Sequence, residues 1–323
     1  MSKKTFYIIL TALIGIIIIG GIIWYFMLKL KEAAPAGGID FTVPGQIKNG
    51  ANLKVISEGP ILSLIKNNEV ILFYDFKGQL WQLNEAEEKP TLSSQAPIEN
   101  LAEIIWPKVI SADGKKIVYQ RNNGLFTSDA SGKNQKTLIS DLKLKDIILK
   151  WPNTNNVALI GKPSGLAAGG LWFLDVRNSN IRKIIGDFFG LEALFSPDGN
   201  SFIYSYVDQN GRDLRLAVYK NGNQKIISNI STLVDKCVWT KDLINIFCAV
   251  PKSWPDSAAL PDDYYKNAFS TSDDIWKINT ETGEKTLIFQ YIGGISNLVV
   301  SNDESHIFFI SKENQFLYKL IIK

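Results

Sequence analysis

The chain is poor in the residues that most catalytic and metal sites need. His306 is the only histidine among 323 residues, and it lies in a strand-like run, where we expect an ordinary sheet residue. Ser-His-Asp triads, Cys-His pairs and multi-histidine metal sites would all depend on it. The two cysteines do not form a metal-spaced set, and no glycine-rich phosphate loop or dinucleotide fingerprint is present. The sequence therefore predicts no cofactor, no metal site and no recognisable catalytic constellation.

A marked excess of charge of one sign is also missing. The 35 basic and 32 acidic residues give a net charge of only +3 and are interspersed along the chain. Binding to nucleic acid would require a basic stripe or tail, so we expect no nucleic-acid partner. The hydrophobic content of 46% is enough for a large core.

One long apolar run stands near the N-terminus. After a short stub (residues 1–5), residues 6–28 carry no charged side chain, and a helix of that length spans a bilayer. The run exceeds the roughly 7–15-residue core of a signal peptide, so an uncleaved transmembrane helix is expected instead. Flanking lysines balance, but the short stub favours an extracytoplasmic C-terminal part, tethered by the flexible residues 29–50. The prediction is a single-pass protein of the cell membrane.

From residue 51 onward a short phrase repeats. Six stretches begin with Lys and continue mainly with β-branched residues or Leu, at intervals of 35–60 residues. They start at Lys54, Lys89, Lys136, Lys183, Lys225 and Lys285. Repeats of this length with short strands are typical of radially arranged β-sheets, which must stack to bury their faces. Lysine suits the outer strand, because charged edges discourage pairing between sheets.

A turn and a strand also recur within the units. The turn is clearest at residues 195–199 (Phe-Ser-Pro-Asp-Gly), and strands with a Trp at the second position occur at 80–84, 171–175 and 275–279. These motifs resemble the WD-like repeats of the TolB family over roughly residues 51–323, although several turns lack the full motif. The resemblance implies a β-propeller of the type that bacterial envelope proteins use as a protein-binding platform. The chain lacks the family's separate N-terminal α/β domain, so TolB's own partners are not carried over.

The distribution of strands predicts how the propeller closes. The last unit has three strands, near residues 296–300, 306–310 and 316–319, whereas residues 52–57 form a fourth-strand phrase before the first unit. We therefore predict an all-β, six-bladed propeller of four-stranded blades over residues 51–323. Residues 52–57 would complete the sixth blade and remove an open edge. A stray strand in the tether is the alternative, and it leaves the last blade incomplete.

Two long loops, residues 161–170 and 251–274, should lie on the same rim. The second provides the candidate binding residues Trp254, Tyr264, Tyr265, Phe269, Asp262 and Asp263. Tyr and Trp are good anchors for a protein or glycan surface, but they could equally pack the loop down across the central channel. The paired aspartates could bind calcium or act as acid and base, yet they match no EF-hand, and solvated or turn-capping carboxylates are expected.

The only two cysteines, Cys237 and Cys248, flank a hairpin turn. With the turn centred between Asp242 and Leu243, they face each other at a distance that a disulfide can bridge. A one-residue shift of the turn would break this register and leave free thiols. The sequence leaves both states open, and an oxidising compartment would favour the bond.

These observations predict a membrane-anchored, extracytoplasmic propeller that binds an envelope protein or peptide and is not an enzyme. Two alternatives remain: a glycan-binding or glycan-active propeller, and a structural subunit of an envelope assembly. An exposed apolar patch on the loop face would favour the partner-binding protein. An exposed apolar patch on an outer blade edge would favour the structural subunit. Close, buried carboxylates in a central pocket would favour the glycan alternative.

Overall fold

The computed structural model describes residues 52–67, 70–93, 108–111 and 113–322, which all belong to one compact unit, Gly45–Lys323. The predicted stub, the apolar run at residues 6–28 and the tether lie outside the described residues. Within the described part, no helix is both long enough and apolar enough to cross a membrane.

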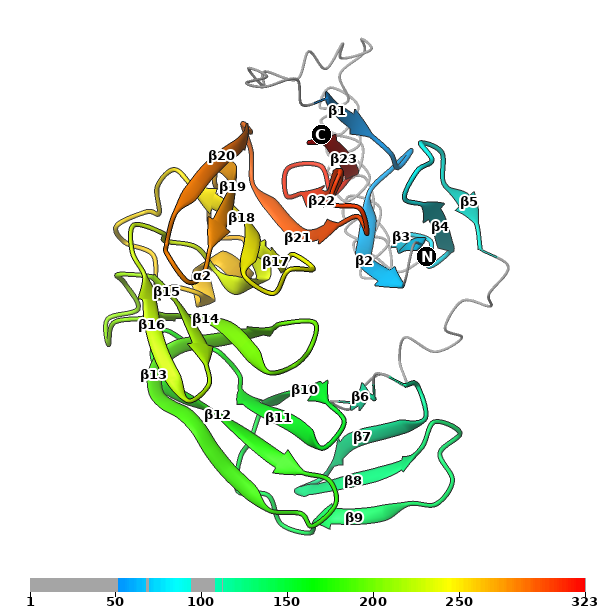
Figure 1. The fold of residues 1–323 in the computed structure, drawn as a ribbon, viewed down its shortest axis with the longest axis vertical. Helices are drawn as coiled ribbons and strands as arrows, with labels where there is room; N and C mark the ends of the chain where they lie inside the picture. The colour runs from blue at the N-terminus through cyan, green and yellow to red at the C-terminus, as the bar shows by residue number, and fades with distance from the viewer. Residues whose placement is uncertain (1–51, 68–69, 94–107, 112, 323) are drawn as a thin grey trace, which may run out of the picture. The chain divides into compact units, whose positions relative to one another are not determined.

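The regular secondary structure of the described residues is almost entirely antiparallel strand, grouped into five sheets (Figure 1). One sheet contains β2 (Ile61–Asn67), β3 (Val70–Asp75), β4 (Leu80–Asn84) and β5 (Thr91–Leu92), and another contains β6 (Lys108–Ile110), β7 (Lys116–Arg121), β8 (Gly124–Asp129) and β9 (Lys136–Ile139). A seven-stranded sheet runs through β10 (Ile147–Asn153), β11 (Asn156–Gly161), β12 (Ala168–Asp175), β13 (Ile181–Phe195), β14 (Ser201–Val207), β15 (Arg215–Lys220) and β16 (Asn223–Ile227). The last two hold β17 (Cys237–Trp239), β18 (Asn245–Pro251), β19 (Asp273–Asn279) and β20 (Lys285–Gln290), and then β21 (Ile295–Val300), β22 (His306–Ser311), β23 (Leu317–Ile321) and β1 (Asn52–Val55). Short helices are η2 (Val234–Lys236) and α2 (Asp262–Tyr265).

The N-terminal strand pairs with the C-terminal one, as predicted. β1 runs antiparallel to β23, with Leu53 opposite Leu320 and Val55 opposite Tyr318 (Figure 1). Beyond β1, the Ile56 amide donates to the Leu317 carbonyl at 2.8 Å, and the Ile56 side chain is buried. The pairing is therefore confirmed, and it covers the edge of β23 that would otherwise be open.

The seven-stranded sheet differs from the predicted pattern at one place. The fourth-strand phrase at Lys183 runs without a break into the next unit's first strand, so β13 is a single strand of 15 residues. The register against the neighbouring strands shifts near this crossing, where Asp187 and Gly190 have φ of 66° and 63°. Positive φ values bend the strand locally, so that its two halves pair with different partners.

The recurring turns share one set of hydrogen bonds. In the turn at residues 196–201, the Ser196 hydroxyl donates to Asp198 at 2.5 Å and accepts from the Ser201 amide at 3.1 Å. The same hydroxyl-to-carboxylate bond occurs at Ser111–Asp113, Thr240–Asp242 and Ser301–Asp303. This bond lowers the pKa of Asp198, and the ionised carboxylate in turn fixes the turn. Gly199 is required, because a Cβ there would lie 1.8 Å from the Pro152 carbonyl oxygen.

Neighbouring sheets bury their faces against one another, and the last sheet packs against the first. One cluster joins Phe308, Ile310 and Leu317 of the last sheet to Ile71 and Phe73 of the first. Similar clusters join β17–β20 to β14–β16 and to β21–β23, and β6–β9 to β10–β12. Strands β11, β14, β18 and β22 are buried along most of their length, because their alternating side chains enter the layers on both faces of the sheet.

The hairpin register predicted for the cysteines is confirmed. Cys237 pairs with Cys248 and Trp239 with Ile246 across β17 and β18. In this structure a disulfide joins the two sulfurs. The oxidation state of the two cysteines in the cell stays a prediction, linked to the extracytoplasmic location.

Candidate functional site

The predicted rim loops meet in the structure. The Gly165 amide, in the β11–β12 loop, donates to Asp262 of α2 at 2.6 Å. A Cβ at Gly165 would lie 2.2 Å from the Leu260 carbonyl oxygen, so glycine permits this close approach. Leu260 in turn donates to the Gly211 carbonyl of the β14–β15 loop at 2.8 Å. Hydrogen bonds therefore hold together the β11–β12, β14–β15 and β18–β19 loops.

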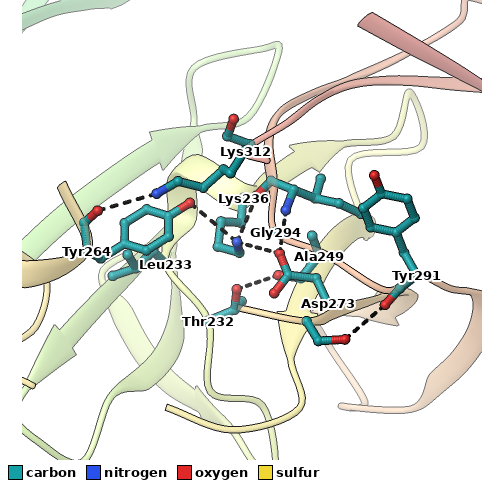
Figure 2. Close-up of polar contacts among 12 residues, drawn as sticks. Thr232, Leu233, Lys236, Ala249, Tyr264, Asp273, Tyr291, Gly294 and Lys312 are labelled. Carbon is teal, nitrogen blue, oxygen red and sulfur yellow. Dashed lines mark hydrogen bonds and ion pairs between the residues drawn. The ribbon is translucent and has the colours of Figure 1, made fainter. Parts of the chain in front are cut away.

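The loop contacts continue into the last sheet. In the β22–β23 turn, the Lys312 ammonium lies 3.5 Å from the centroid of the Tyr264 ring and donates to the Tyr264 carbonyl at 3.3 Å (Figure 2). Glu313 of the same turn accepts from the Gly294 amide at 2.6 Å, in the connection between β20 and β21. We call this set of connected segments the rim. It consists of the β11–β12 and β14–β15 loops, the β18–β19 loop with α2, the β20–β21 connection and the β22–β23 turn.

The candidate aromatic residues of the second loop divide into two groups. Tyr264 is only 2% exposed and lies within 6.4 Å, centroid to centroid, of both Trp254 and Phe269, which are half-buried. The Trp254 indole donates to the Ser231 carbonyl at 3.1 Å. These three residues pack against one another within the loop, as the alternative interpretation expects. Of the four aromatics, only Tyr265 is exposed.

The candidate aspartates accept hydrogen bonds from backbone amides of the loops. Asp262 accepts from Gly165, as described above, and Asp263 accepts from the Ala259 amide at 2.8 Å. Both carboxylates lie in the first turn of α2, and their hydrogen bonds fix the loop segments around it. Among the residues that the structure describes, no group of three or more His, Cys, Asp or Glu side chains could hold a metal ion.

A buried ion pair lies beneath Tyr264, and no local sequence pattern indicates it. Lys236 and Asp273 are both fully buried, with 2.6 Å between ammonium and carboxylate. Figure 2 shows the Lys236 ammonium between the Tyr264 hydroxyl, at 3.3 Å, and Asp273. The ammonium also donates to the Ile295 carbonyl at 2.7 Å, and Asp273 accepts from the Ile295 amide at 2.6 Å. This pair ties η2, β19 and β21 together.

Two further carboxylates lie beside this pair. Glu192 on β13 is opposite Ser205 on β14, and the Ser205 hydroxyl accepts from the Val234 amide of η2 at 3.4 Å. This contact brings Asp235 of η2 toward Glu192. Burial and then the negative charge of Asp235 raise the pKa of Glu192 to about 8. Burial also raises the pKa of Asp235, against the opposing effect of the Lys236 charge. We call Glu192 and Asp235 the acid pair.

Tyr265 connects the acid pair to the surface. Tyr265 as a whole is 46% exposed. Its hydroxyl group is nevertheless buried, and this burial, together with the negative charges of Asp235 and Glu192, raises the pKa of the phenol. The hydroxyl therefore faces the two carboxyls while part of the ring faces solvent. Charged residues inside otherwise apolar runs, such as Glu192 in Gly190-Leu-Glu-Ala-Leu194, are the one signal in the sequence that could have indicated this pair.

Large apolar side chains are exposed on the rim. Leu166 of the β11–β12 loop is 72% exposed, and Ile292 of the β20–β21 connection is 60% exposed. Outer strands also expose single apolar residues, such as Ile226 on β16 at 49%, but there they stand beside exposed lysines such as Lys225. Scattered edge residues need no partner, whereas apolar tips on loops that hydrogen bonds hold in place suggest a contact surface.

Comparisons with known proteins find similarity to solved structures alone. The chain matches no protein-family model and no curated protein. It is similar to an oligogalacturonate lyase in complex with manganese, with 14% identity, a TM-score of 0.49 and coverage of 79% of this chain and 74% of the other. It is also similar to TolB from Acinetobacter baumannii, with 14% identity, a TM-score of 0.43 and coverage of 81% of this chain and 63% of the other. A putative TolB from Agrobacterium tumefaciens has 11% identity and a TM-score of 0.45, with coverage of 84% of this chain and 97% of the other. All three TM-scores lie below 0.5, so no activity or partner is transferred from these proteins to this chain.

Proposed function

We propose that the chain is a membrane-anchored, extracytoplasmic, six-bladed β-propeller that binds a protein or peptide of the cell envelope through its rim. If β13 is counted in both of its groups, the strands of the five sheets make six groups of four, as six blades require. Residues 6–28 supply the anchor, and the hairpin that aligns Cys237 with Cys248 suits an oxidising compartment.

The exposure of Leu166, Ile292 and Tyr265 on the rim carries the binding proposal. Hydrogen bonds to Gly165 and Gly294 fix the backbone next to the first two residues, so their side chains are presented at defined positions. Binding to such a surface costs little conformational entropy, and aromatic and aliphatic side chains gain most from being covered.

One observation favours the glycan alternative. The acid pair consists of two carboxyls that are close and deeply placed, which is the feature that we associated with sugar chemistry. Both lie beneath an aromatic ring that could stack on a sugar. The rim remains the better-supported site, because its residues are exposed without any rearrangement.

The capture of partners by rim variants tests the proposal. Leu166→Asp combined with Ile292→Asp should lower the recovery of bound partner from native membranes about tenfold or more, because each buried aliphatic side chain contributes about 1.5–3 kcal/mol. The full-length chain is captured in mild detergent, and bound proteins are quantified by mass spectrometry. The matched control is Leu92→Asp with Ile226→Asp, which makes the same change on outer strands.

The control also separates the alternatives. Loss of capture only in the outer-strand variant would support a structural subunit that contacts its neighbours through blade edges. Unchanged capture in both variants would refute rim binding. Melting temperatures should stay close to that of the parent chain in both cases, because all four side chains are exposed.

A further inference from the structure

The charge balance beneath the rim is unequal. In the described part of the chain, four carboxylates (Glu192, Asp235, Asp273 and Glu313) lie near two ammonium groups, those of Lys236 and Lys312. Lys236 pairs with Asp273, and Lys312 lies over the Tyr264 ring. No ion pair to Glu192 or Asp235 occurs among the described residues.

One oxygen of each carboxyl in the acid pair also lacks a hydrogen-bond donor among the described residues. Glu192 is 8% exposed, and its Oε2 has no hydrogen-bond partner within the described part of the chain; the same is true of Asp235 Oδ1. A buried, unpaired carboxylate is costly, and it becomes neutral or takes up a cation. Asp235 is half-buried as a residue and the neighbouring Tyr265 is exposed, so the pair lies close to the surface.

The chemistry of the pair selects an organic cation. Two carboxylates are too few for a metal site here, in agreement with the absence of any metal-holding group among the residues described. A primary ammonium needs only two or three acceptors, and these two carboxylates with the Tyr265 hydroxyl supply them. The aromatic face of Tyr265 adds a favourable surface for the approaching cation.

We propose that Glu192 and Asp235 bind the ammonium group of a lysine side chain that a peptide partner inserts beside Tyr265. This inference rests on the proposed function, because the rim residues would hold the rest of the peptide. It adds the partner's chemistry: a basic side chain flanked by apolar residues.

Stabilisation of the full-length chain by n-butylammonium, an analogue of the lysine side chain, tests the proposal. At about 50 mM, with ionic strength matched by sodium chloride, it should raise the melting temperature by about 3 °C or more. The rise should disappear in Glu192→Gln combined with Asp235→Asn, which keeps the shape and removes the charge. It should persist in Glu281→Gln, which removes an exposed carboxylate elsewhere. n-Butanol controls for the apolar chain.

Three results would overturn the proposal. These are no rise in the parent chain, an equal rise with butanol, and a rise that persists in the double variant. A comparison of Nα-acetyl-lysine amide with glucosamine separates a peptide from an amino sugar, and a larger shift with glucosamine would overturn the peptide assignment. Failure here would leave the rim proposal intact, because capture through Leu166 and Ile292 is measured independently.

Discussion

Replacing Lys236 by Met should lower the free energy of unfolding by about 3–5 kcal/mol. The substitution leaves Asp273 charged, fully buried and without its 2.6 Å partner, and the uncompensated charge dominates the cost. The Ile295 carbonyl and the Tyr264 hydroxyl lose a donor as well. Urea denaturation of the parent and variant, followed by tryptophan fluorescence, measures the difference.

Two control variants show whether the buried charge is the cause. Adding Asp273→Leu to Lys236→Met should recover part of the loss, because it removes the unpaired carboxylate. Lys252→Met removes the partner of Asp274 in an ion pair of 3.5 Å near the surface, and it should cost less than about 1 kcal/mol. A cost for Lys236→Met as small as that for Lys252→Met would show that the pair does not hold η2, β19 and β21 together.

The second large effect concerns the N-terminal strand. A chain that begins at residue 59 should be at least about 3 kcal/mol less stable than one that begins at residue 45. It loses the burial of Ile56 and the whole β1–β23 ladder, and it leaves the Leu317 amide without the Ser57 hydroxyl. Melting temperatures and urea midpoints of the two chains give the comparison.

A third chain serves as the control for length. A start at residue 51 removes residues before β1 only and should match the chain that starts at residue 45. Equal stability of the chains that start at 45 and 59 would contradict the closing role of β1. Aggregation of the shorter chain would agree with an exposed edge on β23.

Local patterns in the sequence predict most of the strands. The strand phrases at residues 80–84 and 275–279 match β4 and the last five residues of β19, because alternation and turn residues act over a few positions. The pairing of β1 with β23 followed from a missing strand in one unit and a surplus strand at the other end. The unbroken β13 could not be predicted, since it depends on the positive φ of Asp187, a residue that usually avoids that region.

The candidate site was harder to predict than the strands. Lys236 and Asp273 are 37 positions apart, and nothing local marks them as partners. The sequence places Tyr264 and Tyr265 in a candidate binding loop but does not show which ring is covered, because the burial of Tyr264 depends on Val207, Leu214 and Leu233 from other segments. The acid pair could not be predicted either, because Glu192 lies on β13 and Asp235 on η2, and only the fold brings these segments together.

Site-specific photo-crosslinking in native membranes tests the central claim, that the rim is the binding surface. A photoreactive phenylalanine analogue replaces Leu166, Ile292 or, as control, Ile226 in the full-length chain, one position at a time. The account predicts a discrete adduct with the same partner from positions 166 and 292 and none from position 226. An adduct from position 226 alone, or none from either rim position, would contradict it.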